Sequence, residues 1–353
     1  MLVARDGKAI VAGAGAFPFE MTVPGGTVPT AGVTVVGVLP THRRRGILTS
    51  MMRRQLEDGP EPVAALWASE PTIYGRFGYG LASFTGEIDV PKVAAALALS
   101  EGPRGQVRVV TAEEALESFP ALYDAVRAER PGMMSRTRDW WEHRRLRNPD
   151  SESKPLVRAL LELDGAPAGY ILYRVTQKFE SWATAGHVDV LEALGTSPAA
   201  MREIWRYLFE FDWTSRIEAG QLPADHDLLL LAADPNALKF KLGNGLWVRL
   251  LDLPVALAAR SYAGDDAVVF DVSDAFLQDN EGRWRLAGGQ AERTDDEADL
   301  RLDVTALGSA YLSGVTFCEL LRAGRIEELH EGAAARADAL FRTEQAPWCP
   351  EIF

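Results

Sequence analysis

The chain has 353 residues, of which 37 are Lys or Arg and 50 are Asp or Glu, so its formal net charge is −13. This length favours roughly two or three domains over one, and the apolar and charged fractions are those of an ordinary soluble globular protein. The negative charge argues against nonspecific nucleic-acid binding, which depends on clustered Lys and Arg. It is compatible with attraction of cationic acceptors such as polyamines or amino sugars, although solubility alone would also account for it.

No stretch of the sequence approaches the run of about 20 apolar residues that a membrane helix requires. The first residues, MLVARDGKAIVAG, lack the charged, apolar and small-residue regions of a signal peptide. The cytoplasm is therefore the default location, and secretion without a recognisable signal is the alternative. Cys318 and Cys349 are too few for a disulfide framework and lie at no metal-ligand spacing, so we expect two packing residues and no metal.

Two β-hairpins with Asp-Gly turns begin similar stretches of the chain. The first turn is predicted at Asp6 and Gly7, within LVARDGKAIVAGAGAFPFEM, and the second at Asp164 and Gly165, within RALLELDGAPAGYILYRV. Each hairpin is followed by an alternating strand, GVTVVGVLP or HVDVLEALGTS, that runs into a helix. The helices carry apolar residues at helical spacing: Ile47, Leu48, Met51, Met52 and Leu56 in the first, and Met201, Trp205, Leu208 and Phe209 in the second.

A third pair of segments completes the repeat. VAALWASEPTIYGRFGYGL and DLLLLAADPNALKFKLGNGL are each expected to contain a buried strand, an acidic residue before Pro, and a glycine-rich end. Three motifs that recur in order at an offset of roughly 155 to 165 residues predict a duplicated α/β domain. HRRRGIL in the first copy is replaced by SPAAM in the second, and Tyr74 falls opposite Leu238 or Lys239, so chemistry is expected in the first copy alone.

The pattern changes after Val248. We predict a helix within LLDLPVALAARSY, a hairpin with its turn at Asn280 to Gly282, a strand and a helix within ADLRLDVTALGSAYLSG, and a helix within FCELLRAGRIEELH. These elements suggest an α+β domain of about a hundred residues. The fold class is therefore α/β and α+β, with expected domains at residues 1–105, 106–250 and 251–353.

Arg43, Arg44 and Arg45 precede Gly46 at the turn between the first predicted strand and its helix. A helix N-terminus offers unpaired N–H groups and a partial positive charge, and Gly46 lets the backbone approach a ligand. Guanidinium groups match phosphate oxygens, so we interpret the turn as a diphosphate site; a solvated turn or a targeting signal is the alternative. It is not a P-loop, because no Lys-Ser/Thr follows for Mg²⁺, and there is no GxGxxG dinucleotide fingerprint.

VTVVGVLPTHRRRGIL together with LWASEPTIYGRFGYG resembles the Gcn5-related N-acetyltransferase (GNAT) superfamily, and within it the Eis (enhanced intracellular survival) branch. In that superfamily an Arg/Gln-x-x-Gly-x-Gly/Ala signature binds the pyrophosphate of acetyl-coenzyme A (acetyl-CoA). This chain matches it except at Leu48, where Eis-like proteins commonly have Leu. The resemblance implies two tandem GNAT-like domains, the second degenerate and without a coenzyme site, and a C-terminal domain like a sterol carrier protein.

The resemblance also assigns binding residues. Val36, Gly37 and Val38 would pair with the pantetheine arm at a bulge, and a backbone N–H there would polarise the thioester carbonyl. The remaining positions that match contacts with acetyl-CoA are Arg43, Arg44, Arg45, Gly46, Ile47, Leu48, Thr49, Ser69 and Glu70. On pattern alone, the valines would be strand core and Glu70 a helix N-terminal charge.

Two catalytic roles follow from the resemblance. Tyr74 corresponds to the family's proton donor, and a phenol with a pKa near ~10 can protonate an adjacent thiolate with a pKa of about 8.5. The α-carboxylate of the last residue, Phe353, would be the general base. Without the resemblance, Tyr74 would be a packing aromatic and Phe353 a frayed end, although Trp348 and Pro350 favour a docked tail. The histidines show no catalytic spacing and are expected to be structural or exposed: His42, His143, His187, His226 and His330.

The implied function is acetyl-CoA-dependent N-acetylation of cationic amines, with aminoglycosides or lysine side chains as acceptors, by a homohexamer. Family members begin with a strand and helices that form one wall of the acceptor cleft. This chain reaches Asp6 and Gly7 almost at once, so we expect retained coenzyme residues and an incomplete acceptor pocket. A non-catalytic protein that binds coenzyme A, or a lipid in its sterol-carrier-like domain, is the alternative.

Overall fold

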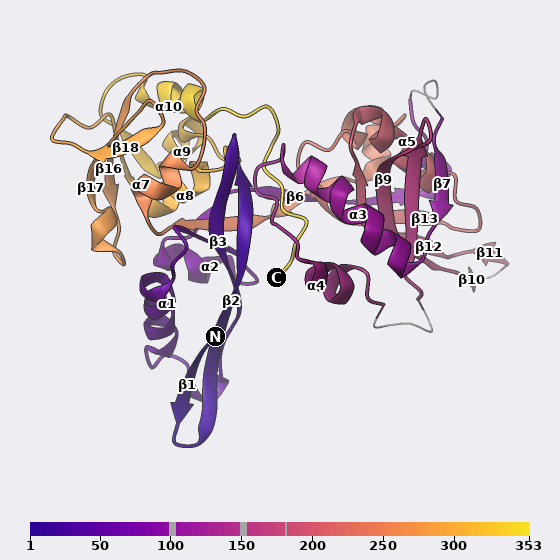
Figure 1. The fold of residues 1–353 in the computed structure, drawn as a ribbon, viewed down its shortest axis with the longest axis horizontal. Coiled ribbons are helices and arrows are strands. Elements are labelled where there is room, and N and C mark those ends of the chain that lie inside the picture. The colour runs from indigo at the N-terminus through magenta and orange to yellow at the C-terminus, as the bar shows by residue number, and fades with distance from the viewer. Residues whose placement is uncertain (99–103, 149–153, 181) are drawn as a thin grey trace. The chain divides into compact units, whose positions relative to one another are not determined.

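A computed structural model describes residues 1–98, 104–148, 154–180 and 182–353. Contacts within the chain divide it into two compact units, which we describe separately (Figure 1). The first unit comprises residues 1–84, 130–134 and 244–353, and the second comprises residues 85–129 and 135–243. Within the described residues, no helix is both long and apolar enough to span a bilayer.

The first unit contains a six-stranded sheet in the order β1-β2-β3-β4-β15-β5. Its strands are β1 (Leu2–Asp6), β2 (Ala9–Val23), β3 (Gly26–Val38), β4 (Val63–Trp67), β5 (Gly80–Leu81) and β15 (Leu246–Leu250). β1, β2 and β3 form an antiparallel meander, β3 and β4 run parallel, and β15 is antiparallel to β4 and β5. Parallel neighbours need a crossover connection, which helix α1 (Ile47–Asp58) supplies between β3 and β4.

The first predicted hairpin is confirmed, but its turn lies further along the chain than expected. Asp6 pairs with Ala9, so the turn residues are Gly7 and Lys8. Gly7 has a φ of 59°, which glycine adopts at little cost. Val11 is the extra residue of a bulge in β2, and it shifts the register of the pair.

A bulge in β3 changes which side chains face α1. Ala31 and Val33 belong to the core under this helix. Val35 then has a φ of 47°, which is unusual for a β-branched residue, and the register with β2 shifts there. Because one extra residue is inserted, Val36 and Val38 pack toward α1 instead, and Val35 is 65% exposed.

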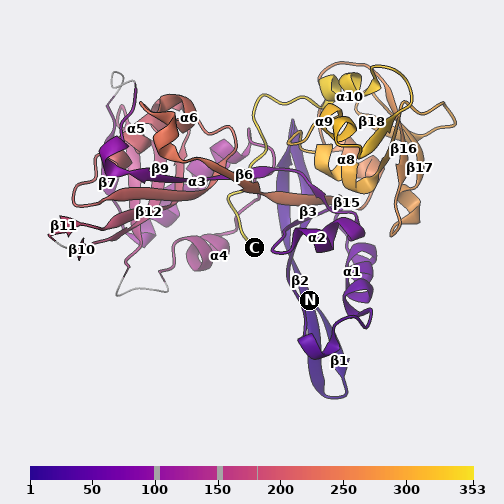
Figure 2. The same ribbon diagram turned by 180° about the vertical axis from the view of Figure 1, so that it is seen from behind.

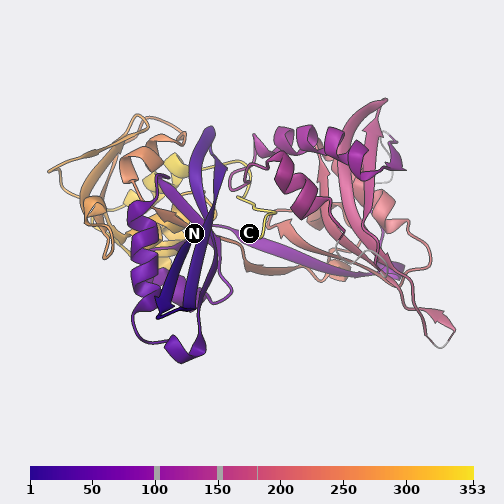
Figure 3. The same ribbon diagram turned by 60° about the horizontal axis from the view of Figure 1, so that its bottom comes forward.

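Helix α1 lies along this face of the sheet (Figure 3). Met51, Met52 and Leu56 are buried, which confirms the predicted apolar stripe, whereas Ile47 and Leu48 in the first turn are half-buried. The half-buried first turn leaves the beginning of α1 near the surface, where a ligand can reach it.

The C-terminal part of the first unit is a second sheet, in the order β18-β17-β16-β19-β20, with helices packed against it (Figure 2). The strands are β16 (Val268–Ser273), β17 (Gly282–Ala287), β18 (Gln290–Arg293), β19 (Leu300–Asp303) and β20 (Ile326–Glu328). The helices are α7 (Leu253–Ala258), α8 (Val304–Ala310), α9 (Phe317–Arg322) and α10 (Ala333–Phe341). The predicted α+β organisation is confirmed, with two differences: residues 274–281 join β16 to β17 in place of a tight turn, and FCELLRAGRIEELH contains β20 after its helix.

The second unit contains a seven-stranded sheet in the order β14-β6-β13-β12-β9-β8-β7. Its strands are β6 (Phe84–Pro91), β7 (Gln106–Val109), β8 (Val157–Leu163), β9 (Ala166–Thr176), β12 (His187–Gly195), β13 (Arg216–Pro223) and β14 (Lys241–Asn244), and β10 (Phe179–Glu180) and β11 (Ala183–Thr184) form a separate hairpin. The helices are α3 (Ala112–Arg127), α4 (Arg138–Trp140), α5 (Pro198–Phe209) and α6 (Leu228–Leu231). The predicted turn at Asp164 and Gly165 is confirmed, with φ values of 51° and 79° that suit a two-residue hairpin turn.

Helices α3 and α5 cover opposite faces of this sheet. Phe119 of α3 stacks on Tyr170 with ring centroids 4.4 Å apart. Ile171, the next residue of β9, belongs instead to the core that contains Ile204 and Trp205 of α5. Successive strand residues point to opposite faces, so the two helices must lie on different sides.

The strand predicted in DLLLL is wrong. Leu228–Leu231 form the short helix α6, in which Leu230 is 90% exposed. The parallel partner of β12 is β13. The leucine run contains no β-branched residue, and Leu favours helix over strand.

Two strands belong to a different sheet from the one that the predicted domain boundaries imply. β6, which lies within the segment 1–105 predicted as the first domain, pairs with β13 in the second unit. β15, which lies within the segment 106–250 predicted as the second domain, pairs with β4 in the first unit. The predicted boundaries follow the order of the chain, whereas the sheets interleave.

A buried charge cluster lies in the second unit. Arg136 donates to both carboxylate oxygens of Glu192 at 2.9 and 2.7 Å, and its guanidinium lies 3.7 Å from the ring centroid of Tyr123. Arg145 and Tyr170 also donate to Glu192. Burial alone would raise the pKa of Glu192, but the two arginines lower that pKa to about 2.

The Glu192→Gln variant is expected to lose about 3 to 5 kcal/mol of unfolding free energy at pH 7, because two buried guanidinium groups then face a neutral amide. The folded-state pKa lies below the unfolded value of about 4.3, so wild type holds this contribution above that pH and loses it as the pH falls through about 2. Urea unfolding should therefore show the two proteins converging in acid. Glu142→Gln, at an exposed pair with Arg138, should change stability by less than about 1 kcal/mol, and equal effects of the two variants would contradict the prediction.

Candidate functional site

A pocket of about 350 Å³ lies in the first unit between the end of β3, the turn before α1 and the segment that follows β4. Most residues that the sequence assigned to acetyl-CoA and catalysis line it: Val36, Gly37, Val38, Arg43, Arg44, Gly46, Ile47, Leu48, Thr49, Glu70 and Tyr74. The assigned residues that do not line it are Arg45, Ser69 and Phe353. Three lining residues were not assigned to it from the sequence: His42, Ile73 and Arg76.

The pocket lies where β3 and β4 part. These parallel strands pair only from Thr30 opposite Val63 to Gly32 opposite Ala65, although both continue further. Beyond Gly32, the edge of β3 that faced β4 turns toward the pocket lined by residues 36–38. Backbone N–H and C=O groups on such an edge can hydrogen-bond an extended ligand in place of a strand.

The turn before α1 offers an open anion site. Gly46 caps the helix with a φ of 77°, and a Cβ at Gly46 would have nothing within 4 Å. Neither a capping side chain nor an acidic residue in the first turn occupies the helix N-terminus. Arg44 also has a positive φ of 59°, a conformation found where successive N–H groups form a concave anion site.

The corresponding turn of the second unit is closed by its own side chains. Ser197 caps α5 by accepting from the backbone N–H of Ala200 at 3.2 Å. The sulfur of Met201 accepts from the N–H of Gly195 at 3.0 Å, and a Cβ at Gly195 would lie 2.7 Å from the backbone nitrogen of Met201. This comparison gives a physical reason for expecting an anion at the first copy alone.

The three consecutive arginines point to different surroundings. Arg43 and Arg44 line the pocket, and the Nε of Arg43 donates to the carbonyl oxygen of Val38 at 3.4 Å. Arg45 instead lies 4.0 Å from the carboxylate of Asp6, and the same carboxylate lies 3.2 Å from Nε2 of His42. The hairpin tip therefore takes one guanidinium of the triplet out of the pocket.

Arg76 adds a positive charge on the opposite wall of the pocket. It follows Tyr74 in the short segment formed by α2 (Pro71–Tyr74) and the 3-10 turn η2 (Gly75–Phe77), and its guanidinium lies 4.9 Å from the ring centroid of Phe77. In the sequence, Arg76 is visible only as the arginine of IYGRFGYG. Nothing local showed that this side chain would lie on the pocket.

Tyr74 is half-buried at the same wall. Burial raises the pKa of its phenol, and the nearby Glu70 carboxylate raises that pKa further. The phenol is therefore held in the protonated form that a proton donor requires. Ser69 is exposed directly before Glu70 and does not reach the pocket lining.

The chain end is docked against the sheet and is not frayed. Phe353 is 9% exposed, and its ring centroid lies 5.1 Å from that of Phe19. A Cβ at Gly32 would lie 3.2 Å from the Phe353 ring. Upstream, the N–H of Trp348 donates to the carbonyl oxygen of Pro131 at 2.8 Å. The predicted docking of the tail is thus present in the fold.

Phe353 and α1 lie on opposite faces of the first sheet. Ala31 faces α1, and Gly32, the next residue of β3, faces the Phe353 ring. Gly32 also forms the last pair between β3 and β4. The chain end therefore docks on the other side of the point where the pocket strands part.

One group in the described chain could offer three metal ligands: His187, Asp189 and Glu218, whose ligand atoms lie within 4.8 Å of one another. Arg216 already pairs with Glu218 at 2.5 Å. Because an arginine neutralises one prospective ligand, we assign no metal to this group.

Family models match three consecutive parts of the chain. An acetyltransferase (GNAT) domain matches residues 1–82, a second one matches residues 132–250, and a sterol carrier protein domain matches residues 253–350. The fold therefore consists of two GNAT domains and a sterol carrier domain, as the sequence resemblance predicted.

Curated relatives cover nearly the whole chain. It is 42% identical to an uncharacterized N-acetyltransferase of Streptomyces avermitilis over 99% of its length and 88% of the relative. It is 34% identical to N-acetyltransferase Eis of Mycobacterium tuberculosis over 97% of its length and 87% of that protein. The crystal structure of Eis1 from Mycobacterium abscessus matches with a TM-score of 0.87 and 35% identity, covering 99% of this chain and 90% of the other. The chain belongs to the Eis-like GNAT family and is an N-acetyltransferase.

Proposed function

We propose that the protein transfers the acetyl group of acetyl-CoA directly to an amine, with Tyr74 as general acid and the Phe353 α-carboxylate as general base. One observation carries this proposal. Arg43, Arg44 and Gly46 of the turn before α1, which we call the arginine turn, line a single pocket with the open edge of β3 and Tyr74. This pocket lies on the α1 side, while the chain end docks on the opposite face where β3 and β4 part. Donor and acceptor would approach the gap between the strands from opposite faces.

In the reaction, the amine nitrogen attacks the acetyl carbonyl carbon, so an N–C bond forms and the C–S bond breaks. Before the attack, the ammonium gives one proton to the Phe353 carboxylate. The Tyr74 O–H proton passes to the departing thiolate, and the second proton that the nitrogen loses on becoming an amide restores the Tyr74 phenol. Backbone N–H groups at residues 36–38 would stabilise the negative charge that develops on the carbonyl oxygen. A terminal carboxylate has an ordinary pKa near ~3.5, so it serves as a base only where the acceptor ammonium is held directly against it.

We propose cationic amines, aminoglycoside-like molecules or lysine side chains, as acceptors. The net charge of −13 would draw such molecules toward the protein, and a carboxylate base suits an ammonium group. The family resemblance further suggests a cytoplasmic homohexamer and domain boundaries near residues 105 and 250. Coenzyme A is the co-substrate, and the proposed reaction needs no metal.

The test is a thiol-release assay with acetyl-CoA and a panel of aminoglycosides, polyamines and lysine peptides. We expect amine-dependent release of free coenzyme A and none with alcohols that carry no amine. Calorimetry that detects no binding of coenzyme A would contradict the proposal, as would thiol release that does not depend on any amine.

A second candidate function, lipid binding, is favoured by a pocket of about 340 Å³ in the C-terminal domain. Phe317 and Phe341 contribute to its largely apolar lining. Displacement of a fluorescent fatty acid from the full chain tests it, and Tyr74→Phe should leave such binding unchanged. Absence of saturable displacement would remove this candidate.

Arg44→Ala is expected to weaken coenzyme A binding by about 10- to 100-fold, because one charge-assisted hydrogen bond contributes about 1.5–3 kcal/mol. Arg45→Ala is the matched control, since its side chain lies beside Asp6 and outside the pocket. We expect it to change affinity by less than about threefold. Titration calorimetry measures both, and equal losses would show that the hairpin tip releases Arg45 to the ligand.

A further inference from the structure

The segment that carries Tyr74 has little regular structure of its own. α2 spans Pro71–Tyr74 and η2 spans Gly75–Phe77, so the proposed acid sits on single turns. Isolated turns of this length are unstable in water, because nucleation of a helix is costly. The position of the Tyr74 phenol must therefore be fixed by whatever packs behind the segment.

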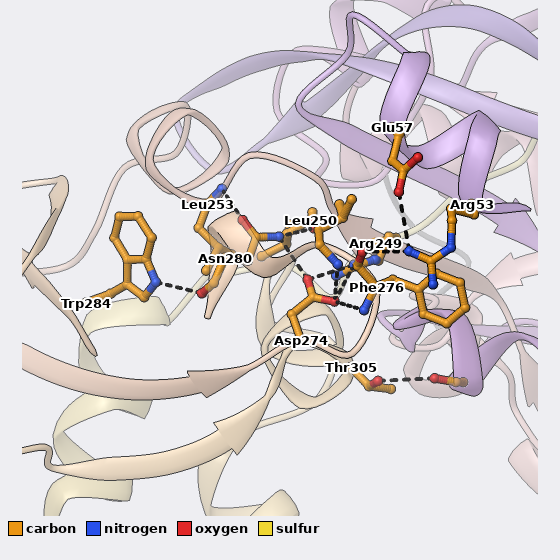
Figure 4. Close-up of polar contacts among 12 residues, drawn as sticks. Arg53, Glu57, Arg249, Leu250, Leu253, Asp274, Phe276, Asn280, Trp284 and Thr305 are labelled. Carbon is orange, nitrogen blue, oxygen red and sulfur yellow. Dashed lines mark hydrogen bonds and ion pairs between the residues drawn. The ribbon is translucent and has the colours of Figure 1, made fainter. Parts of the chain in front are cut away.

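The C-terminal part of the first unit packs directly behind it. The hydroxyl of Thr305, at the beginning of α8, donates to the carbonyl oxygen of Gly75 at 3.4 Å (Figure 4). A Cβ at Gly78 would lie 2.9 Å from Val304, and one at Gly80 would overlap the Thr305 carbonyl oxygen. The approach is so close that these two positions of the segment have no room for a side chain.

A buried guanidinium completes this support. Arg249 of β15 is 0% exposed, and a Cβ at Gly78 would lie 2.8 Å from its Cζ and Nε. Its Nη2 donates to both oxygens of Asp274 at 2.7 Å, and Asn280 donates to Asp274 at 3.0 Å (Figure 4). The backbone N–H of Phe276 also donates to Asp274, at 3.1 Å. The loop between β16 and β17 therefore fixes Arg249 under the Tyr74 segment.

Stability alone does not explain this arginine. Within the described residues, its Nε and Nη1 have no hydrogen-bond partner, and the hydroxyl of the fully buried Tyr79 has none either. Unpaired buried donors cost free energy, and a packed apolar side chain in place of a buried ion pair is often no less stable. An arrangement that costs free energy in this way favours a functional role for the arginine, such as fixing the position of a neighbouring group.

Tyr79 links this support to the proposed acid. Its ring centroid lies 6.1 Å from that of Tyr74, with the planes at 76°, an edge-to-face contact. Tyr79 follows Gly78, which contacts Arg249, and the backbone N–H of Tyr79 donates to the Tyr74 carbonyl oxygen at 3.3 Å. A displacement of Arg249 would therefore move the aromatic surface on which Tyr74 rests.

We infer that Arg249, held by Asp274, is a positioning residue for Tyr74, so that the C-terminal domain sets the geometry of the proton donor. This inference rests on the proposed role of Tyr74. It assigns no contact with acetyl-CoA to Arg249, which does not line the pocket. The inference therefore predicts an effect on the rate of transfer and little effect on coenzyme binding.

The test is the double variant Arg249→Met with Asp274→Asn, which removes both charges and leaves no buried ion unpaired. We expect kcat to fall by about 10- to 100-fold, because a displacement of about 1 Å can cost that much, while the Kd for coenzyme A stays within about twofold. The control is Arg301→Met with Asp271→Asn, an Arg–Asp pair of the same domain that is exposed and lies 3.1 Å apart. We expect this control to keep wild-type kcat and Kd.

Hydrogen exchange supplies a readout that does not need turnover. Amides of residues 70–81 should exchange faster in the double variant than in wild type, while those of β2 and β3 keep their protection. If the double variant does not fold, Tyr79→Leu, which removes the ring contact with Tyr74 and leaves the Arg249–Asp274 pair in place, should reproduce the loss of kcat with unchanged Kd. Unchanged kcat and unchanged exchange would overturn the inference, as would equal losses of kcat and coenzyme affinity. A wild-type protein without acetyl transfer would instead overturn the proposed function, and the exchange result would still decide whether Arg249 holds the segment.

Discussion

The Tyr74→Phe variant is expected to transfer acetyl groups about 100 to 10,000 times more slowly than wild type, the usual contribution of a general acid. The phenyl ring keeps the packing against Tyr79, so the Kd for coenzyme A should stay within about twofold. Steady-state thiol release gives kcat, and calorimetry gives the affinity. Tyr207→Phe, the same chemical change at a tyrosine of the second unit, should leave both quantities unchanged.

The role of Tyr74 as proton donor also predicts the direction in which kcat changes with pH. Burial, and then the Glu70 carboxylate, raise the pKa of Tyr74 above its ordinary value of about 10. The donor form is present below that pKa and is lost as the pH rises through it, so kcat should fall only in strong alkali. Glu70→Gln removes a negative charge, lowers the pKa of Tyr74 and moves the alkaline fall to lower pH. A rate that survives Tyr74→Phe, or an alkaline limb that Glu70→Gln does not move, would assign the proton donor elsewhere.

The sequence predicted those parts of the fold that have local signals. Asp-Gly turns, alternating strands and apolar residues at helical spacing specify the two hairpins, β3 with α1, and β12 with α5, because each signal lies within one element. The prediction of a strand at residues 228–231 was wrong, because periodicity cannot separate a short buried strand from a short helix. The exchange of β6 and β15 between the sheets was also out of reach, since strand pairing over such distances leaves no local pattern.

Some residues of the candidate site could likewise be predicted from the sequence, and others could not. The turn at Gly46 could be read from residue types, because arginines and a glycine at a helix beginning have a direct physical meaning. Arg76 and Arg249 could not, because their importance depends on what the fold brings near them. Arg249 lies in an apolar strand, and its partner Asp274 lies in the loop that follows β16, a strand of a different sheet of the same unit. Single charged residues in such positions carry no signal until the tertiary contacts are known.

If the proposed function holds, the open and closed helix ends would explain how one fold can carry an active and an inactive copy. In the first unit, Gly46 leaves the amides at the beginning of α1 without a capping side chain. In the second unit, Ser197 and Met201 take up the groups that an anion would need. The absence of a ligand site from the second unit would therefore need no change of fold, because a capping residue stabilises the helix by the same hydrogen bonds that would hold a phosphate.

Blocking the terminal carboxylate is expected to lower kcat by about 100- to 10,000-fold, if Phe353 supplies the general base. A C-terminal amide, introduced by peptide ligation, removes the charge but keeps the Phe353 ring against Phe19 and Gly32. One glycine added after Phe353 keeps the charge but displaces it by up to ~3.6 Å, so it should also be severely impaired.

Ile352→Ser is the matched control, because Ile352 is 56% exposed and the substitution leaves the carboxylate in place. Coenzyme affinity should not change in any of these variants, since the arginine turn lies on the α1 side and the chain end on the other. An amide variant that keeps more than half of the wild-type kcat would show that the amine loses its proton to another group or directly to water. A parallel loss of kcat and thermal stability in the amide would show that the carboxylate holds the tail in place, and only a loss of kcat with a folded, coenzyme-binding protein identifies it as the base.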